Sequence, residues 1–364
     1  MRAMIRPDLL ELPGYVAITP TDVLAERLGI KPEDVIKLDG NENPFGPSPR
    51  ALEAIAHERA YHIYPDPDQQ RVRGALAAFL NVDAERIVCG LGSDDLIDLV
   101  MRAVIAPGDG VINCPPTFGM YPFSTEINGG RVIDVPRLEN FALDVAAIEK
   151  AAPQAKLIFL ASPNNPTGNR LSPQELERLL ATDLIVVVDE AYIDFAGREH
   201  SSVKLVEQYE NLVVLRTFSK WAGLAGLRAG YGVMATVLSS VLMTIKQPYN
   251  LNVAAGVAML ASLEDRVLLD ERACKIAGTR DRLAEMLAGL PWITPYPSEA
   301  NFILCRLDGV DALEVKDRLA SRGIFVRYFD TAMLRNHLRI SAGLQEHNEP
   351  LVRALREIGA ELGR

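Results

Sequence analysis

One lysine in this sequence has the surroundings of an amine that does covalent chemistry. Lys220 follows an apolar run and a Thr-Phe-Ser segment, and Arg228 comes eight residues later. Upstream, Asp189 closes a strongly apolar run, and Asn165 lies in an Asn-Pro-Thr-Gly turn. An amine can bond to an aldehyde, a carboxylate can hold a protonated ring nitrogen, and a guanidinium can bind a phosphate.

Together these groups match the needs of pyridoxal 5'-phosphate. The cofactor requires an amine that holds its aldehyde as a Schiff base and a carboxylate that keeps its pyridine nitrogen protonated. Lys220 and Asp189 are therefore the predicted catalytic residues. The phenolic oxygen of the ring needs hydrogen-bond donors, a role that suits the hydroxyl of Tyr192 and the side-chain amide of Asn165.

A phosphate site is predicted beside the lysine and at the start of one helix. Thr217, Ser219 and Arg228 supply hydroxyls and a guanidinium. The run from Cys89 to Leu96 has the pattern of a strand that passes through a Gly-x-Gly turn into an apolar helix, whose first backbone N–H groups can bind an anion. The turn lacks the third glycine of a dinucleotide fingerprint, so a nicotinamide site is disfavoured.

Each motif alone has an ordinary explanation. A Ser-Lys pair after a strand is usually an exposed loop, an Asp at the end of an apolar strand is often a turn former, and Asn-Pro-Thr-Gly can be a simple β-turn. Only the joint occurrence of the motifs in this order favours a cofactor site.

The composition is typical of an enzyme and argues against several other classes. The 364 residues exceed one typical core, so a large and a small domain are expected. A net charge of −10 argues against a nucleic-acid partner. The four cysteines lack metal-ligand spacing, so no metal site is predicted, and the sequence has no run of about 18 apolar residues that would enter a membrane. We therefore expect a cytoplasmic protein with small-molecule substrates.

Short apolar strands alternate with helical patterns over the first two thirds of the chain. This alternation predicts an α/β fold with a mostly parallel sheet sandwiched by helices. The motifs fall at the carboxyl ends of the strands, where an open α/β sheet binds its ligands. Expected helices span about 94–106 and 173–181, and the expected strands are 86–89, 110–113, 156–160, 184–188 and 212–215.

A smaller α/β unit is expected after a long helix at about 272–290. Its strands are expected at 302–305, 325–328 and 337–341. We divide the chain into an amino-terminal arm (1–40), a large cofactor-binding domain (41–250) and a small carboxyl-terminal domain (251–364). The arm either packs with the small domain or crosses to a second subunit.

In these motifs and along nearly its whole length, the sequence resembles the fold-type I aminotransferases of the aspartate aminotransferase superfamily. Within them it is most similar to the histidinol-phosphate aminotransferases. Similar blocks run from Leu38-Asp39-Gly40-Asn41-Glu42-Asn43-Pro44, through Tyr64-Pro65-Asp66, to Leu338-Arg339-Ile340-Ser341-Ala342-Gly343. The resemblance implies a homodimer with shared active sites, in which Tyr64 reaches the cofactor phosphate of the neighbouring subunit.

The resemblance also assigns residues to the cofactor. It makes Lys220 the Schiff-base lysine and Asp189 the pyridinium partner, and it implies that the ring oxygen is held by Tyr192 and Asn165. The phosphate end would be lined by Ser93, Asp94, Ser219 and Arg228. Phe118 stands where many relatives have a Tyr that stacks on the ring, and Phe keeps the stacking face while losing the hydrogen bond of the hydroxyl.

Substrate recognition is expected from the small domain and the arm. Arg327 and Arg339 lie on two of the expected strands, and a guanidinium can hold either a carboxylate or a phosphate. The resemblance assigns Arg339 to the acidic group of the substrate and Arg327 to the same anion-binding region. Tyr15, in the arm, is expected to close over it.

The implied reaction is a transamination in histidine biosynthesis, between L-histidinol phosphate or imidazole-acetol phosphate and glutamate or 2-oxoglutarate. Two alternatives use the same fold: a threonine-phosphate decarboxylase, which is a lyase, and an aromatic amino-acid aminotransferase. The cofactor residues do not separate them, because the substrate bond orthogonal to the ring decides which bond breaks. A non-enzymatic effector-binding module would need a fused DNA-binding segment, for which we expect no room before Leu38.

Overall fold

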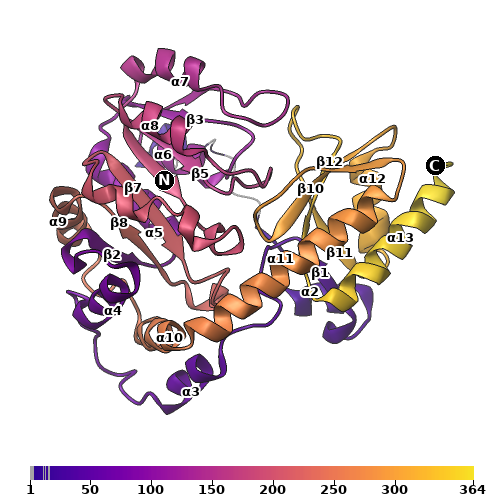
Figure 1. Ribbon diagram of the computed structural model, residues 1–364, viewed down its shortest axis with the longest axis horizontal. Coiled ribbons are helices and arrows are strands. Elements are labelled where there is room, and N and C mark those ends of the chain that lie inside the picture. Colours follow the sequence, from indigo (N-terminus) through magenta and orange to yellow (C-terminus); the bar gives the residue numbers. More distant parts are fainter. Residues whose placement is uncertain (1–3, 11, 13, 15–16) are drawn as a thin grey trace.

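Two β-sheets lie side by side in the computed structural model, which describes residues 4–10, 12, 14 and 17–364 (Figure 1). The larger sheet has the strand order β2-β8-β7-β6-β5-β3-β4 and the smaller has the order β1-β11-β12-β10-β9. The strands of the larger sheet are β2 (Ile87–Gly90), β3 (Gly110–Asn113), β4 (Arg131–Asp134), β5 (Leu157–Ala161), β6 (Ile185–Asp189), β7 (Leu212–Thr217) and β8 (Gly230–Val233).

The larger sheet is mostly parallel, as predicted. Neighbouring strands from β4 through β3, β5 and β6 to β7 all run in the same direction, and only β8 is antiparallel to its two neighbours. The five strands predicted from apolar runs are confirmed, with ends that move by one or two residues. Their side chains are buried along most of their length, which is typical of a sheet covered on both faces.

Strand β8 was not predicted, because its sequence Gly-Tyr-Gly-Val is dominated by a residue that usually marks turns. The glycine has a packing reason. A Cβ on Gly230 would lie 2.6 Å from the carbonyl carbon of Gly92 and 2.8 Å from the backbone nitrogen of Ser93. Gly230 therefore lets this strand lie against the turn where the predicted phosphate site begins.

Helices cover both faces of the larger sheet. One apolar cluster joins the sheet to α5 (Ser93–Val104), α6 (Met120–Ile127) and α9 (Thr236–Ile245). A second cluster lies on the other face. It includes residues of α4 (Gln70–Leu80), α7 (Val145–Ala151), α8 (Pro173–Leu180) and α10 (Val253–Glu264). Helix α3 (Pro49–His57) packs on α10. The predicted helices at about 94–106 and 173–181 are confirmed as α5 and α8, the latter starting at a capping box of Ser172 and Glu175.

The smaller sheet is formed by both ends of the chain. Its strand β1 comes from the amino-terminal region and pairs in parallel with β11, whereas β9, β10 and β12 pair in antiparallel fashion. The three strands predicted for the small domain are confirmed. The bounds are β1 (Ile36–Leu38), β9 (Ile293–Pro295), β10 (Phe302–Leu307), β11 (Ile324–Tyr328) and β12 (His337–Ser341), and α11 (Arg266–Ala288), α12 (Ala312–Ala320) and α13 (Asn348–Glu361) pack against them.

The predicted division of the chain at residues 40 and 250 stays a prediction. The strand β1 lies before the first boundary and joins the smaller sheet. Beyond the second boundary, α10 and the first half of α11 contribute side chains to the apolar cluster of the larger sheet, and the second half of α11 contributes to that of the smaller one. The long helix α11 thus links the two sheets (Figure 1).

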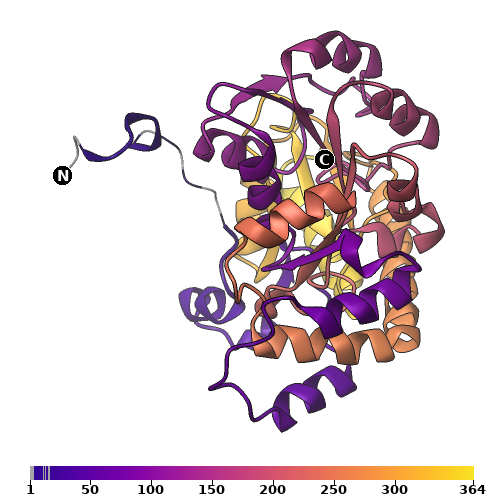
Figure 2. The same ribbon diagram turned by 90° about the vertical axis from the view of Figure 1, so that its left-hand side faces the viewer.

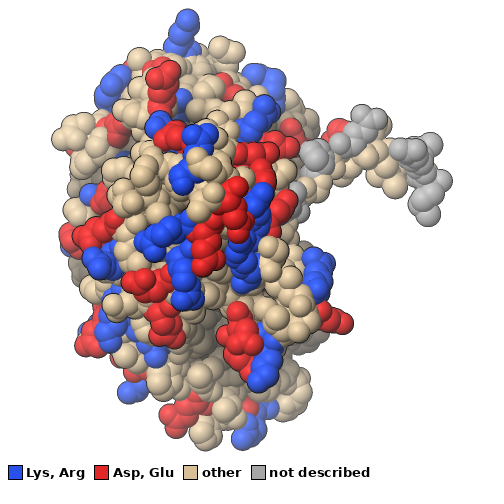
Figure 3. All heavy atoms as spheres, turned by 90° about the vertical axis from the view of Figure 1, so that its right-hand side faces the viewer, with Lys and Arg blue, Asp and Glu red and all other residues tan. Residues whose placement is uncertain are grey.

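Helix α1 (Pro7–Leu10) projects from the body of the molecule (Figure 2), and the Arg6 guanidinium just before it donates a hydrogen bond to the carbonyl of Ile127 at the end of α6 (3.0 Å). Helix α2 (Thr21–Leu28) instead packs on the body, where Leu24 and Ala25 are buried with Val35 beside Phe325 of β11. On the face over α12 and α13, acidic and basic side chains alternate (Figure 3), with Arg318 between Glu314 and Glu361.

Within the described ranges, none of the helices combines the length and hydropathy that a membrane crossing requires.

Candidate active site

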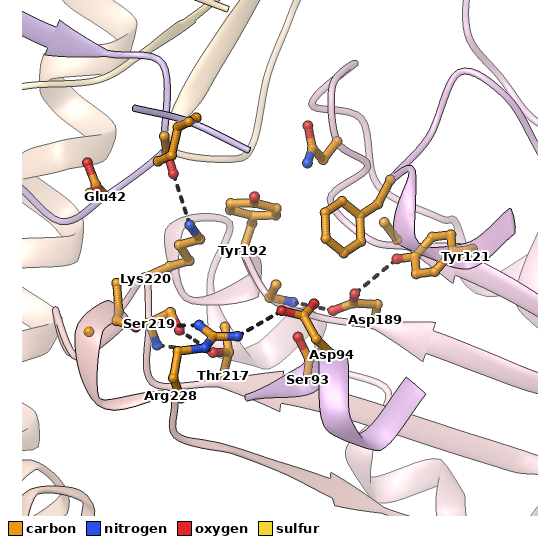
Figure 4. Close-up of a pocket in the computed structure, with 18 residues that line it drawn as sticks. Glu42, Ser93, Asp94, Tyr121, Asp189, Tyr192, Thr217, Ser219, Lys220 and Arg228 are labelled. Atoms are coloured by element: carbon orange, nitrogen blue, oxygen red, sulfur yellow. Dashed lines mark hydrogen bonds and ion pairs between the residues drawn. The ribbon is translucent and has the colours of Figure 1, made fainter. Parts of the chain in front are cut away.

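A cavity of about 380 Å³ opens where three parallel strands of the larger sheet end. Ala161, Asp189 and Thr217 are the last residues of β5, β6 and β7, and each lines the cavity. The structure brings ten of the predicted cofactor residues to this cavity (Figure 4): Ser93, Asp94, Phe118, Asn165, Asp189, Tyr192, Thr217, Ser219, Lys220 and Arg228. This position agrees with the general rule for ligands of open α/β sheets.

Lys220 is a buried amine with a reduced affinity for protons. Its Nζ donates a hydrogen bond to the carbonyl oxygen of Gly40 (3.0 Å), in the segment that follows β1. Burial, assisted by the positive charge of Arg339, lowers the Lys220 pKa from 10.5 to about 8. More of the amine is therefore neutral near physiological pH than in an exposed lysine, which favours a nucleophile or a general base.

Asp189 is a buried carboxyl whose pKa is shifted in the opposite direction to that of Lys220. Burial raises its pKa from 3.8 to about 6, although two hydrogen bonds oppose the rise. The Tyr121 hydroxyl donates to Oδ2 (2.9 Å), and the backbone N–H of Ala191 donates to Oδ1 (3.1 Å). Both donors are neutral, so the carboxylate would be further stabilised by a cation such as a protonated ring nitrogen.

The wall between these two groups carries hydrogen-bonding groups and an aromatic ring. Tyr192 accepts a hydrogen bond from the Asn41 amide (3.1 Å), and Asn165 accepts one from the Arg339 guanidinium (2.7 Å). Phe118 lines the same cavity and meets Tyr121 edge to face, with ring centroids 5.6 Å apart. An aromatic ring that enters the cavity would find one apolar wall and one wall of polar side chains (Figure 4).

The opposite end of the cavity is suited to an anion. Helix α5 begins at Ser93 after Gly92, and its first backbone N–H groups have no partner within the helix. Thr217 and Ser219 are joined by a hydrogen bond between their hydroxyls (2.9 Å), and both line the cavity. These hydroxyls and N–H groups, with the nearby guanidinium of Arg228, form the donor set that a phosphate needs.

The guanidinium of Arg228 is held in place by backbone geometry and by charge. Arg228 adopts a left-handed conformation (φ 54°), and its Nη2 forms an ion pair with Asp94 (2.7 Å). A Cβ on Gly92 would lie only 2.8 Å from the same Nη2. Gly92, itself at φ +83°, therefore leaves room for a guanidinium beside the helix start.

A second, wider cavity of about 970 Å³ shares Lys220, Asn165, Tyr192 and Arg228 with the first. Arg327 and Arg339 line it, as partners across β11 and β12. The Arg339 guanidinium also donates to the carbonyl of Asp39, which fixes it beside the segment that follows β1. Two guanidinium groups next to the reactive amine suit an anionic substrate.

Tyr64 is a predicted site residue that the structure does not bring to the cavity within one chain. Tyr64 is 77 % exposed, stacks on Tyr249 with ring centroids 4.4 Å apart, and is not among the residues that line either cavity. Tyr15 lies outside the described residues. Among the described residues, no group of three or more potential ligands could hold a metal ion.

Three contributors to the site were not predicted from the sequence. Tyr121 is fully buried within an ordinary apolar helix, so nothing in the local pattern marks its hydroxyl as the donor to Asp189. Gly40 and Asn41 lie in a motif that the resemblance includes, but they act through a backbone carbonyl and through long-range contacts. Such contacts leave no periodic or spacing signal in a sequence.

Comparisons with known proteins agree with this geometry. Residues 33–355 match the family described as aminotransferase class I and II. The chain is 51 % identical to a histidinol-phosphate aminotransferase of Roseiflexus castenholzii, over 98 % of both proteins.

The chain belongs to the aminotransferase class I and II family. A solved structure of a histidinol-phosphate aminotransferase from Sinorhizobium meliloti, in complex with pyridoxal-5'-phosphate, superposes with a TM-score of 0.89 at 29 % identity and covers 98 % of each chain. The fold-type I architecture predicted from the sequence is therefore confirmed for this aminotransferase.

The fold by itself does not determine which reaction a member of this family catalyses. An L-threonine-O-3-phosphate decarboxylase from Porphyromonas gingivalis has a TM-score of 0.79 with this aminotransferase at 22 % identity, over 89 % of this chain and 99 % of the other. At that identity the likeness shows the shared fold alone. The choice of reaction depends on the full-length sequence similarity and on the site.

The raised Asp189 pKa predicts how stability changes with pH in the cofactor-free protein. A carboxyl whose pKa is higher in the folded state loses stability as the pH rises through about 6. Asp189→Asn removes that loss, so we expect a gain of up to about 3 kcal/mol over the wild type at pH 7, since one pKa unit corresponds to about 1.4 kcal/mol. Below about pH 4 the gain should vanish.

Urea unfolding of the cofactor-free wild type and variant between pH 4 and pH 8 measures this difference. Asp183→Asn, which changes an exposed carboxyl outside the cavity, is the matched control and should show no pH-dependent gain. An equal effect of Asp189→Asn at pH 4 and pH 7 would contradict the account of Asp189 as a carboxyl destabilised by burial.

Proposed function

We propose that this protein is a pyridoxal-phosphate-dependent histidinol-phosphate transaminase of histidine biosynthesis. It moves the amino group between L-histidinol phosphate and 2-oxoglutarate, with imidazole-acetol phosphate and glutamate as the other pair. The observation that carries the proposal is the cavity in which Lys220 and Asp189 lie with a phosphate-suited helix start. The 51 % identity to a histidinol-phosphate aminotransferase supports the choice of substrate.

The residues of the cavity fit the cofactor in their chemistry and arrangement. When bound, pyridoxal phosphate supplies an aldehyde that bonds to amines and a ring that accepts electrons from the substrate α-carbon. Lys220 is the amine placed to bond to that aldehyde, and Asp189 is the carboxylate placed to keep the ring nitrogen protonated. Ser93, Thr217, Ser219 and Arg228, with the first N–H groups of α5, hold the phosphate.

Lys220 has a second role once the substrate amine has replaced it. The released Nζ would be the base that takes the proton from the substrate α-carbon, a role favoured by the burial that lowers the Lys220 pKa to about 8 in the cofactor-free protein. Asp189 favours this transfer because its negative charge stabilises the protonated ring. Phe118 lines the same cavity and would pack on the ring face, while Tyr192 and Asn165 would hold the ring oxygen.

The substrate anion is bound from the side of the smaller sheet. Arg339, which is buried between Asn165 and the Asp39 carbonyl, binds the carboxylate of glutamate or the phosphate of histidinol phosphate. Arg327 lies opposite it on the neighbouring strand and extends the same positive region. Tyr15, which lies outside the described residues, is the third proposed substrate contact.

The active site is completed by a second copy of the chain. Tyr64 and Tyr249 form an exposed aromatic pair, 77 % and 45 % accessible, in the single chain. Tyr64 lines neither cavity of its own chain. By resemblance to the aminotransferases, it binds the cofactor phosphate of the partner subunit in a homodimer. The four cysteines are all free thiols, which fits a reducing cytoplasm.

The purified protein should form glutamate from L-histidinol phosphate and 2-oxoglutarate, and Lys220→Ala should lower the rate by about 10³-fold or more, because it removes both the bonding amine and the base. Lys156→Ala, which changes an exposed lysine paired with Asp109, should keep the wild-type rate. The rate of glutamate formation measures both.

Two results would assign a different enzymatic function to the protein. Release of carbon dioxide from O-phospho-L-threonine without glutamate formation would make the protein a decarboxylase. Faster amino transfer from L-phenylalanine or L-tyrosine than from histidinol phosphate would make it an aromatic aminotransferase. Full activity of Lys220→Ala would contradict the chemical role of the lysine.

Shared active sites predict that two inactive variants complement each other. In a mixed dimer of Tyr64→Ala and Lys220→Ala subunits, one site carries both changes and the other carries neither. Co-expression with two affinity tags and purification of the mixed dimer should therefore restore about half of the wild-type activity, because one of two sites is intact. If Tyr64 serves its own subunit, both sites carry a defect and the mixed dimer stays as inactive as its parents.

A further inference from the structure

Asn41 has hydrogen bonds to both halves of the molecule. Its side-chain Nδ2 donates to the Tyr192 hydroxyl (3.1 Å) in the large-sheet wall of the cavity. Its Oδ1 accepts from the Ser341 hydroxyl (2.7 Å), at the end of β12 in the smaller sheet. Asn41 and Ser341 are 1 % and 3 % exposed, so water does not compete for these bonds.

The backbone of Asn41 is fixed as firmly as its side chain. Its N–H donates to the Ser341 hydroxyl (2.9 Å), and its carbonyl accepts from the Asn301 amide (2.9 Å). Asn41 adopts a left-handed conformation (φ 53°), which asparagine tolerates better than most residues. The residue is therefore held in one place and one orientation.

The hydrogen-bond pattern decides which way the Asn41 amide points. The Ser341 hydroxyl has one hydrogen, and it already accepts a bond from the Asn41 N–H. That hydrogen is donated to Oδ1, and Nδ2 therefore faces Tyr192. In a flipped amide Oδ1 would face Tyr192, and the Ser341 hydroxyl would accept two bonds while its own hydrogen lost Oδ1 as an acceptor.

This orientation determines the role of the Tyr192 hydroxyl. The Asn41 amide nitrogen can only donate, so the Tyr192 oxygen accepts from it and must direct its own hydrogen to a different atom. Tyr192 lines the cavity, where the phenolic oxygen of the cofactor is the acceptor that needs a donor. A hydroxyl that accepts one bond also becomes a stronger donor in the next.

We propose that Asn41 is a positioning residue that makes Tyr192 a hydrogen-bond donor toward the phenolic oxygen of the bound cofactor. The inference rests on the proposed function and extends it to a residue that does not touch the cofactor. A bond donated to that oxygen competes with the proton that the Lys220–cofactor linkage shares with it. Loss of the Asn41 amide therefore raises the pKa of that linkage.

The pH midpoint of the visible absorbance of the bound cofactor measures this pKa without any turnover. Asn41→Gly removes the amide and tolerates the left-handed backbone. We expect its midpoint to rise by about half to one pH unit, the three- to tenfold change in proton affinity that one hydrogen bond produces. Tyr192→Phe should raise the midpoint at least as far.

A double variant separates positioning from a general structural effect. If Asn41 acts through the Tyr192 hydroxyl, adding Asn41→Gly to Tyr192→Phe should change the midpoint no further. Ser341→Ala keeps Asn41 and its backbone, but loosens the amide, and should give a smaller rise. Arg170→Ala breaks an ion pair with Glu299 that also joins the two halves of the molecule, and it should leave the midpoint unchanged.

Two outcomes would overturn the inference while leaving the proposed function intact. One is a wild-type midpoint in Asn41→Gly together with a raised midpoint in Tyr192→Phe. The other is an undiminished effect of Asn41→Gly in the Tyr192→Phe background, which would assign the effect to structure. A wild-type protein that binds no pyridoxal phosphate would instead overturn the proposed function, and this inference with it.

Discussion

The burial of two ionisable groups in one cavity is the constraint on which this site depends. Burial lowers the pKa of Lys220 to about 8 and raises that of Asp189 to about 6, so the charged form of each group is destabilised. The two pKa shifts favour two different interactions with the cofactor. A neutral amine can bond to an aldehyde, and a carboxylate short of a cation binds a protonated ring nitrogen.

The larger sheet positions one half of this arrangement, and the segment after β1 positions the other. Asp189 ends β6, and Lys220 follows β7, so neighbouring parallel strands bring them to one edge. Three consecutive residues then cross the cavity: the Asp39 carbonyl accepts from Arg339, the Gly40 carbonyl accepts from Lys220, and the Asn41 amide donates to Tyr192. One short segment thus contacts the substrate site, the reactive amine and the ring-oxygen site.

The parts of the fold that could be predicted from the sequence are those that depend on local pattern. Apolar runs identified the strands that end at Asp189 and before Lys220, and their alternation with helices predicted a mostly parallel sheet. Family-like motifs predicted ten residues that the structure gathers in one cavity. Strand β8 was missed because its glycines resemble a turn, and no local pattern reveals that Gly230 packs closely against Gly92. Tyr121 and Asn41 were missed because their partners are 68 and 151 residues away.

The most direct measurement of the central claim is the protonation state of the cofactor ring. Pyridoxal phosphate labelled with ¹⁵N at its ring nitrogen can be bound to the wild type and to Asp189→Asn, and the nitrogen chemical shift recorded from pH 6 to pH 9. The account predicts a protonated nitrogen throughout in the wild type and an unprotonated one in Asp189→Asn, because the carboxylate stabilises the positive ring. An unprotonated nitrogen in the wild type, or the same shift in both proteins, would contradict it.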